Sequence, residues 1–274
     1  MSLGREALNW AAPTWAAIDQ AVHEENVRAG VAAKVIPLHG PLPRAVTVPA
    51  EAIDPATMTI DESAVMPLVE LTIDFSLTRQ QVEQEDELGT AATLARRASA
   101  LLTHAEDVVV LQGDAALDAK LLGGAVNGRG PAGPGLVNGA AETVAADGQG
   151  SFAAVARAFS ILQAGSHTGP YALLLDADEY AAAFEVPDGQ LVHSAERLRG
   201  LVQAFYGTAA MPHGRGVLVS VGGETVDLVI GSDPTVAFLG VDANDRFGFR
   251  VVERFVLRVK DPTGCVRLEL GAKA

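Results

Sequence analysis

The chain has 274 residues, of which 49% are hydrophobic and 20% are charged. This composition is typical of a globular protein with a sizeable core, and it excludes a chain that is disordered throughout. Acidic residues outnumber basic residues 34 to 20, giving a formal charge of −14, which opposes binding to the phosphates of nucleic acid or of an anionic membrane.

The first helix is predicted by apolar residues at helical spacing from Trp15 to Val22, and it should end near Gly30. An extended segment is expected over residues 34–38. Residues 46–75 are also extended, with two strand-like halves around a polar middle that contains proline, which predicts a long hairpin. Because an isolated two-stranded ribbon is marginal in water, we expect this hairpin to pack on another chain.

A stripe of Leu and Ala with a 3.6-residue period predicts a long helix over residues 88–105. A short apolar run follows at 108–111. Residues 123–150 contain nine of the 28 glycines and two prolines, so we interpret them as a long irregular loop that does not pack.

The second half of the chain begins with a helix for which Ser151 is the predicted N-cap. We expect a buried strand at 171–175 and short helices over 176–184 and 194–205. The remaining predictions are strands: a hairpin formed by 217–221 and 226–230, an alternating strand at 247–259, and a last strand at 266–270. The sequence contains no repeat and no clear linker, and its fold class is α+β.

Two short motifs have both a chemical and a structural interpretation. Residues 128–133 match the dinucleotide-binding pattern G-x-G-x-x-G, but Pro131 removes one amide and no strand is predicted before it, so a flexible loop is favoured. Asp176, Asp178 and Glu179 could hold a divalent cation or provide a catalytic acid. For these acids the favoured interpretation is capping of a helix and favourable charge in its first turn.

The other reactive side chains form no catalytic or metal-binding pattern in the sequence. The six histidines lack metal-ligand spacing, and no serine stands in a G-x-S-x-G turn. The single cysteine, Cys265, excludes an intramolecular disulfide and is interpreted as a buried small apolar residue. We expect no catalytic residue, metal or cofactor. The alternative is a small soluble hydrolase or nucleotide-binding enzyme that uses residues 128–133 or the acids at 176–179.

We find no apolar run of the roughly 20 residues needed to span a bilayer. The N-terminus also lacks the basic flank and apolar stretch of a secretory signal peptide. These observations predict a cytoplasmic protein.

Six motifs in a characteristic order resemble the encapsulin shell proteins (family 1 encapsulins, also called linocin-type bacteriocins) over nearly the whole chain. These motifs are Trp15-x-x-Ile18-Asp19, Val35-Ile36-Pro37-Leu38-x-Gly40-Pro41, Pro67-Leu68-Val69-Glu70-Leu71 with Phe75-x-Leu77, Glu106-Asp107-x-Val109-x-x-x-Gly113, Gly169-Pro170-Tyr171-Ala172-Leu173, and Gly222-Gly223 followed by Asp227-Leu228-x-x-Gly231-x-Asp233.

The resemblance implies the major-capsid-protein fold of tailed bacteriophages. Its expected parts are an N-terminal helix and extended arm (1–45), an elongated hairpin (46–75), a peripheral domain (76–134 and 226–274) and an axial domain (135–225). It also implies self-assembly into an icosahedral shell of sixty subunits. The shell would enclose a cargo enzyme, such as a dye-decolorising peroxidase or a ferritin-like protein, and its pores would pass small molecules.

In the family, a short terminal peptide of the cargo docks in an apolar groove. By position, the residues that would line this groove here are Val31, Val35, Leu38, Val236 and Phe238. For Val35 and Leu38, a place in the core is an equally good interpretation. We expect Phe238→Asp to permit assembly and to abolish cargo retention.

The resemblance also assigns a pore and shows some departures from the family. Residues Pro187, Asp188, Gly189 and Gln190 would form a loop at the fivefold pore. Gln80 replaces a tryptophan that is linked to flavin binding in some members, so we predict no flavin. Several residues depart from the family pattern near the groove and suggest an unusual cargo peptide: Glu25, Asn26, Ala33 and Pro37.

Overall fold

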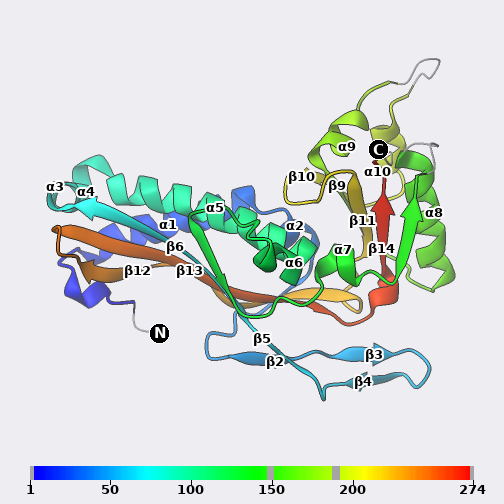
Figure 1. Cartoon of the computed structure of the whole chain (residues 1–274), viewed down its shortest axis with the longest axis horizontal. Helices are drawn as coiled ribbons and strands as arrows, with labels where there is room; N and C mark the ends of the chain where they lie inside the picture. The colour runs from blue at the N-terminus through cyan, green and yellow to red at the C-terminus, as the bar shows by residue number, and fades with distance from the viewer. Residues whose placement is uncertain (1–2, 147–150, 187–191, 272–274) are drawn as a thin grey trace.

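The computed structural model describes residues 3–146, 151–186 and 192–271. It contains two bodies, each built on a five-stranded sheet, and a thin arm that runs beside them (Figure 1). None of the helices among the described residues is both long and apolar enough to cross a lipid bilayer.

The first body is a mainly antiparallel sheet covered by two long helices, α1 (Ala12–Ala29) and α5 (Thr90–Gln112), which pack on each other. Its strands, in spatial order, are β1 (Leu38–His39), β12 (Val226–Val241), β13 (Arg246–Val259), β6 (Val69–Thr78) and β7 (Val126–Arg129). Shorter helices complete the first body: η1 (Arg5–Ala7), α3 (Arg79–Glu83), α4 (Glu85–Leu88), and α6 (Asp114–Asp118) and α7 (Gly135–Gly139), which both contact α5.

Helix α5 buries the apolar stripe that predicted it, but its limits differ from the prediction. The expected first residue, Leu88, lies in α4 and is 63% exposed, because Gly89 in a left-handed conformation separates the two helices. The apolar run at 108–111 is not separate: it forms the last turns of α5 and is fully buried. Burial on all sides favours helix here despite the weak helix propensity of three consecutive valines.

The second body is a mixed sheet with helix α8 (Ser151–Ala164) packed on it. Its strands, in spatial order, are β10 (Ala204–Thr208), β9 (Tyr171–Asp176), β11 (Arg215–Ser220), β14 (Cys265–Glu269) and β8 (Glu142–Ala145). The short helices α9 (Ala177–Ala182) and α10 (Ser194–Arg199) lie at its upper end in Figure 1, and η2 (Pro262–Gly264) precedes β14. Strand β9 is buried on both faces, as predicted; its four middle residues are apolar, and its last residue, Asp176, is polar.

The predicted hairpin of 217–221 and 226–230 is wrong. Strand β11 pairs with β9 and β14 in the second sheet, whereas β12 pairs with β13 and β1 in the first. The two glycines at 222–223 therefore mark the crossing between sheets rather than a tight turn. Two apolar runs around a Gly-Gly pair look the same in the sequence whether they form one hairpin or belong to two sheets. Only the strands with which they pair distinguish the two arrangements.

Two further expectations fail because tertiary contacts override the local pattern. The helix predicted to reach residue 205 ends at Arg199, and residues 204–208 form β10 in parallel pairing with β9. The glycine-rich region is not an unpacked loop, because it contains β7, α7 and β8. Leu136 and Val137 of α7 are each 1% exposed. The N-cap position before α8 lies outside the described residues, and Ser151 itself is the first helical residue.

The segment expected to be extended over 34–38 begins as a short helix, α2 (Ala32–Val35). Its start is fixed by Asp107 of α5, whose carboxylate accepts hydrogen bonds from the amides of Val31 and Ala32 at 3.1 and 2.7 Å. A cap supplied by a distant helix leaves no local signal in the sequence.

The arm is a narrow ribbon of two short antiparallel pairs. Strand β2 (Thr47–Pro49) pairs with β5 (Val65–Pro67), and β3 (Ala52–Asp54) pairs with β4 (Thr59–Asp61). Residues 69–75, which the sequence placed in the same hairpin, belong instead to β6 and pair with β13. The arm therefore leaves the body before residue 47 and returns at residue 68 (Figure 1).

Candidate functional site

Three of the five predicted groove residues lie along the β12 edge of the first sheet, whereas Val31 and Val35 stand at the start and the end of α2. Val236 and Phe238 are on β12 itself, and Leu38 of β1 pairs with Leu228 near the start of that strand. At about 3.3 Å per residue, Leu228 and Val236 are roughly 25 Å apart along the strand. The structure thus brings Val236 and Phe238 together and places Leu38 at the opposite end of the same edge.

Most of these side chains belong to the core. Val236 is fully buried, Phe238 is 7% exposed and Val35 is 8% exposed, whereas Leu38 is 58% exposed. Val31 is half-buried and packs against the same core. For an incoming partner, the end of the edge at 236–238 therefore offers backbone hydrogen-bonding groups, and the end at Leu38 offers an apolar side chain.

Both ends of the β12 edge already have partners from the same chain. Near the start of the strand, the amide of Leu228 donates to the carbonyl of Pro37 at 2.9 Å, and the amide of Leu42 donates to the carbonyl of Ile230 at 2.8 Å. At the other end, the amide of Phe238 donates to the carbonyl of Leu3 at 2.8 Å. Residues 231–235 lie between them, where the pairing with β13 is interrupted by register shifts.

An aromatic cluster fixes the N-terminal segment and α1 against the sheet. The ring of Phe249 stacks on Trp10 at 5.4 Å and on Phe75 at 5.2 Å, and it contacts Phe238 at 5.4 Å. The indole of Trp15 meets that of Trp10 edge-on at 5.0 Å. Such aromatic contacts add to the free energy of burial and set the position of the segment before α1.

Sequence reasoning did not include this N-terminal segment in the site. The available signal was the pair of apolar residues Leu8 and Trp10 before a helix, which indicates a segment that is packed rather than free. One residue that departs from the family pattern has a packing role: the amide oxygen of Asn26 accepts a hydrogen bond from Thr103 of α5 at 2.8 Å. Asn26 therefore contributes to the packing of α1 on α5.

The structure favours the packed interpretation of residues 128–133. The amide of Ala132 donates to the Asp114 carboxylate at 2.6 Å, so the loop is tied to α6. The helix that follows, α7, starts at Gly135, where an added Cβ would lie 2.4 Å from the amide nitrogen of Gly113. The expectation that no strand precedes the motif is wrong, because β7 covers its first two residues and pairs with β6.

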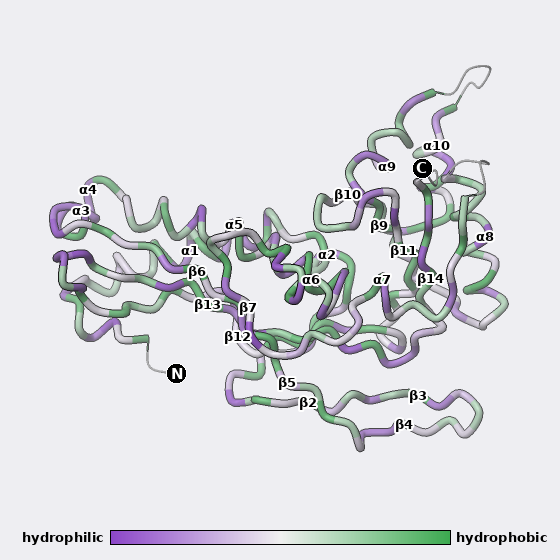
Figure 2. The backbone as a smooth tube through the Cα atoms, viewed as in Figure 1, coloured by the Kyte–Doolittle hydropathy of each residue, from purple (hydrophilic) through white to green (hydrophobic). Residues whose placement is uncertain are grey.

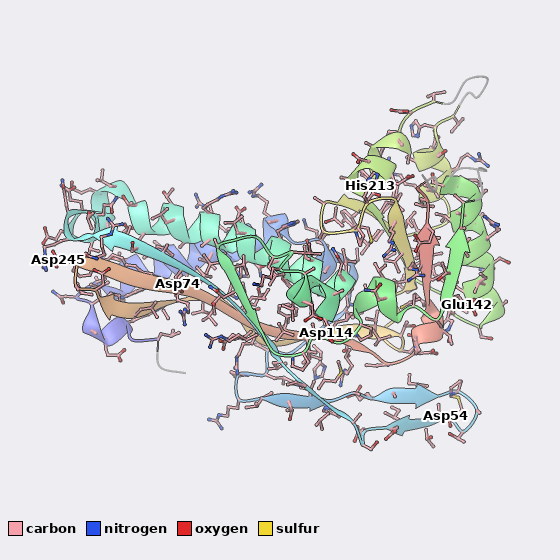
Figure 3. The ribbon with its side chains drawn as sticks, in the orientation of Figure 1. Asp54, Asp74, Asp114, Glu142, His213 and Asp245 are labelled. Atoms are coloured by element: carbon pink, nitrogen blue, oxygen red, sulfur yellow. The ribbon has the colours of Figure 1, made fainter. Side chains whose placement is uncertain are left out.

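The acidic cluster acts as a helix cap, as the favoured interpretation predicted. The buried carboxylate of Asp176 accepts from the amides of Asp178 and Glu179 at 2.8 and 2.9 Å, and also from those of Gly214 and Arg215. His213 lies nearby, with Nδ1 3.4 Å from an Asp178 oxygen (Figure 3). Because backbone amides occupy both oxygens of Asp176, capping accounts for this arrangement.

Cys265 and His167 are the next two reactive side chains, and both are buried in the fold. Burial raises the pKa of the Cys265 thiol in β14 to about 12, so this thiol is unreactive at neutral pH. His167 is buried, and its Nε2 lies 3.0 Å from the hydroxyl of Thr263. The predicted pore residues Pro187, Asp188, Gly189 and Gln190 lie outside the described residues.

Comparison with known proteins decides the family. A sequence profile for the family described as encapsulating protein for peroxidase matches residues 1–256. The chain belongs to the encapsulin shell-protein family. The type 1 encapsulin shell protein of Myxococcus xanthus strain DK1622 is 28% identical over 275 residues, which cover 93% of this chain and 92% of that protein.

Solved structures confirm the predicted capsid fold of this encapsulin. The virus-like particle from Pyrococcus furiosus matches with a TM-score of 0.69 at 18% identity, covering 93% of this chain and 99% of that one. The capsid of Myoviridae phage XM1 matches with a TM-score of 0.56 at 13% identity, covering 89% and 92%. The family and its relatives are structural shell proteins, so this encapsulin is a shell protein and not an enzyme.

Proposed function

We propose that this encapsulin assembles into a closed icosahedral shell of sixty copies in the cytoplasm, and that the shell encloses a cargo enzyme. In this proposal the first body, with residues 76–134 and most of 226–274, is the peripheral domain. The second body, built on residues 140–225 together with strand β14, is the axial domain, so α7 at 135–139 and β14 depart from the boundaries expected from the sequence. Residues 187–190 would line the fivefold pore.

The observation that carries the proposal is the apolar surface of the arm. Four of its large apolar side chains are exposed: Val46 72%, Met58 83%, Ile60 59% and Val65 64%. A two-stranded ribbon with such side chains in water gains stability when a second surface covers them. In a symmetric shell every copy provides the same covering surface, so closure leaves no arm exposed.

Assembly is tested by the size of the purified chain. We expect size-exclusion chromatography to give a megadalton peak, and negative-stain imaging of that peak to show hollow particles of uniform diameter. A peak of one or two chains that persists across salt concentration and pH would contradict the proposal.

For the cargo, we propose an extended terminal peptide that docks along the β12 edge next to α1. An exposed strand edge binds such a peptide through its backbone, and neighbouring apolar side chains select the sequence. The description of the family names peroxidase, which supports a peroxidase as cargo, and a ferritin-like protein remains the alternative. Because Phe238 is buried in the aromatic cluster, Phe238→Asp would disturb the core and is not a clean test of docking.

Leu38→Asp is a cleaner test of cargo docking, because Leu38 is exposed beside β12. We expect the variant to assemble normally and to lose most of its co-purifying cargo, because a charge would stand where an apolar cargo side chain docks. The measurement is the ratio of cargo to shell protein in purified particles. Leu121→Asp, at a residue that is 49% exposed after α6, is the matched control. Equal cargo in both variants would contradict this placement.

A further inference from the structure

Residues 3–5 lie against the β12 edge in the way that an added strand would. The carbonyl of Leu3 accepts the amide of Phe238 at 2.8 Å, and the Arg5 guanidinium donates to the carbonyl of Val236 through Nε at 2.9 Å and Nη2 at 2.8 Å. Two backbone groups of β12 that an extended peptide would use are therefore already bonded within the chain.

Arg5 connects this contact to α1. Its guanidinium also donates to both carboxylate oxygens of Asp19, at 2.8 and 2.6 Å, and lies 4.5 Å from the ring centroid of Trp15. The side chain of Arg5 is 20% exposed, so the ion pair is only partly open to water. Arg5 thus bridges α1 and the β12 edge.

Gly4, which stands between Leu3 and Arg5, permits the close approach of this segment to strand β12. It has a φ of +65°, and an added Cβ would lie 2.4 Å from the carbonyl oxygen of Phe238. Both observations mean that a residue with a side chain at position 4 cannot keep this contact, since the backbone conformation is strained and the carbonyl is part of a sheet.

The backbone groups at 236–238 cannot bond to the N-terminal segment and to a docking peptide at the same time. We infer that residues 3–5 are a displaceable intrachain occupant of the β12 edge that competes with an extended cargo peptide. The inference rests on the docking route proposed above. It makes cargo loading depend on an equilibrium between bound and released states of the N-terminal segment, so the apparent affinity for cargo is reduced by the fraction of closed edges.

Gly4→Ala and Arg5→Ala should each release the segment by different means, one by steric conflict and the other by loss of the anchor. Gly223→Ala is the control, because Gly223 also has a positive φ, of +98°, but nothing lies within 4 Å of an added Cβ. The first readout is hydrogen–deuterium exchange in assembled particles for the fragment that contains Phe238. We expect faster exchange in both release variants and no change in Gly223→Ala.

The second readout is binding of a fluorescein-labelled peptide with the sequence of residues 3–10, present while particles are dissociated and reassembled. Release should strengthen its incorporation by about tenfold relative to the original chain. Unchanged exchange at Phe238 or equal incorporation in all variants would overturn the inference. Cargo content is measured separately. An edge that opens and binds the peptide in particles that never carry cargo would refute the docking proposal, whereas displaceable occupancy of the β12 edge by residues 3–5 would still hold.

Discussion

Glu106 of α5 and Glu253 of β13 place two carboxyl groups together inside the first body. They are 2% and 1% exposed, and Oε2 of Glu253 is buried and has no hydrogen-bond partner among the described residues. Burial and the neighbouring Asp107 raise the pKa of Glu106 to about 8, and burial together with Glu106 raises the pKa of Glu253 well above its ordinary value. The pair is therefore stable in the folded chain only when it holds a proton.

This pair predicts that the protein loses stability as the pH rises. Because the folded pKa of Glu106 is above its unfolded value of 4.5, its contribution is complete below pH 4.5 and is lost as the pH rises to about 8. The loss is up to about 1.4 kcal/mol per pH unit for one proton. Glu106→Gln cannot ionise, so it should show a smaller decline and be more stable than the original chain at pH 8.

The measurement is the midpoint of thermal unfolding of assembled particles between pH 5 and pH 9. The exposed residue Glu87 provides the control Glu87→Gln, which should retain the original pH dependence. An identical decline in Glu106→Gln and in the original chain would show that other groups control the pH response.

At the scale of elements, the base of the arm is joined to the first sheet by a charged cluster. The Arg258 guanidinium of β13 donates to both oxygens of Asp227 on β12, at 2.9 and 2.7 Å, and also pairs with Glu51 of the arm. Lys260 lies 2.9 Å from Asp227 and 3.3 Å from Glu51. The amide of Ile53 donates to the carbonyl of Lys260 at 2.9 Å, so backbone and side chains hold the arm in one direction.

Removing one member of this cluster should destabilise the protein because Arg258 is only 3% exposed. Asp227→Ala leaves the buried charge of Arg258 without its bidentate partner, and we expect the free energy of unfolding to fall by about 3 kcal/mol. Asp74→Ala is the matched control: Asp74 forms the same bidentate cross-strand pair with Arg250, but at side-chain exposures of 46% and 30% (Figure 3). We expect that control to cost less than about 1 kcal/mol. Urea unfolding of both variants compares the two, and equal losses would contradict the importance of burial.

At the scale of the whole molecule, the arm extends away from its attachment to the first body (Figure 1), and Figure 2 shows apolar stretches along it. Four of its large apolar side chains are exposed. The main core continues from the first body onto one face of the second sheet, and a second core lies on the other face of that sheet. Val48 and Leu68 at the base of the arm share a small cluster with Val229 and Val256 of the first sheet, whereas Met58 and Ile60 farther along the arm are exposed. Changes on the arm should therefore affect assembly much more than the folding of the chain.

Ile60→Asp is expected to prevent assembly while the chain stays folded. The side chain is 59% exposed, so the charge costs little in the isolated chain but would be buried in a contact between copies. Size-exclusion chromatography should show a shift from particles to small species, with an unchanged circular dichroism spectrum. Glu62→Ala, two residues along the arm, should still assemble. Intact particles from Ile60→Asp would show that this face of the arm is not part of the contact.

The sequence alone determined those parts of this encapsulin whose signal is local or is carried by the order of motifs. The apolar stripe of α5, the buried strand β9 and the alternating strand β13 follow from periodicity, and the six ordered motifs indicated the family and hence the capsid fold. The side chains of Asp176, Asp178 and Glu179 likewise received their correct interpretation as a helix cap and first turn.

Tertiary structure decided which strand pairs with which and which groups are accessible. The apolar runs on either side of Gly222 are compatible with one hairpin or with two sheets, because pairing depends on partners far away in the sequence. Val236 was predicted as a groove residue, yet its side chain is buried and only its carbonyl, bonded to Arg5 231 residues away, lies at the edge. Burial and long-range hydrogen bonds arise only when distant segments meet, so no local pattern could reveal them.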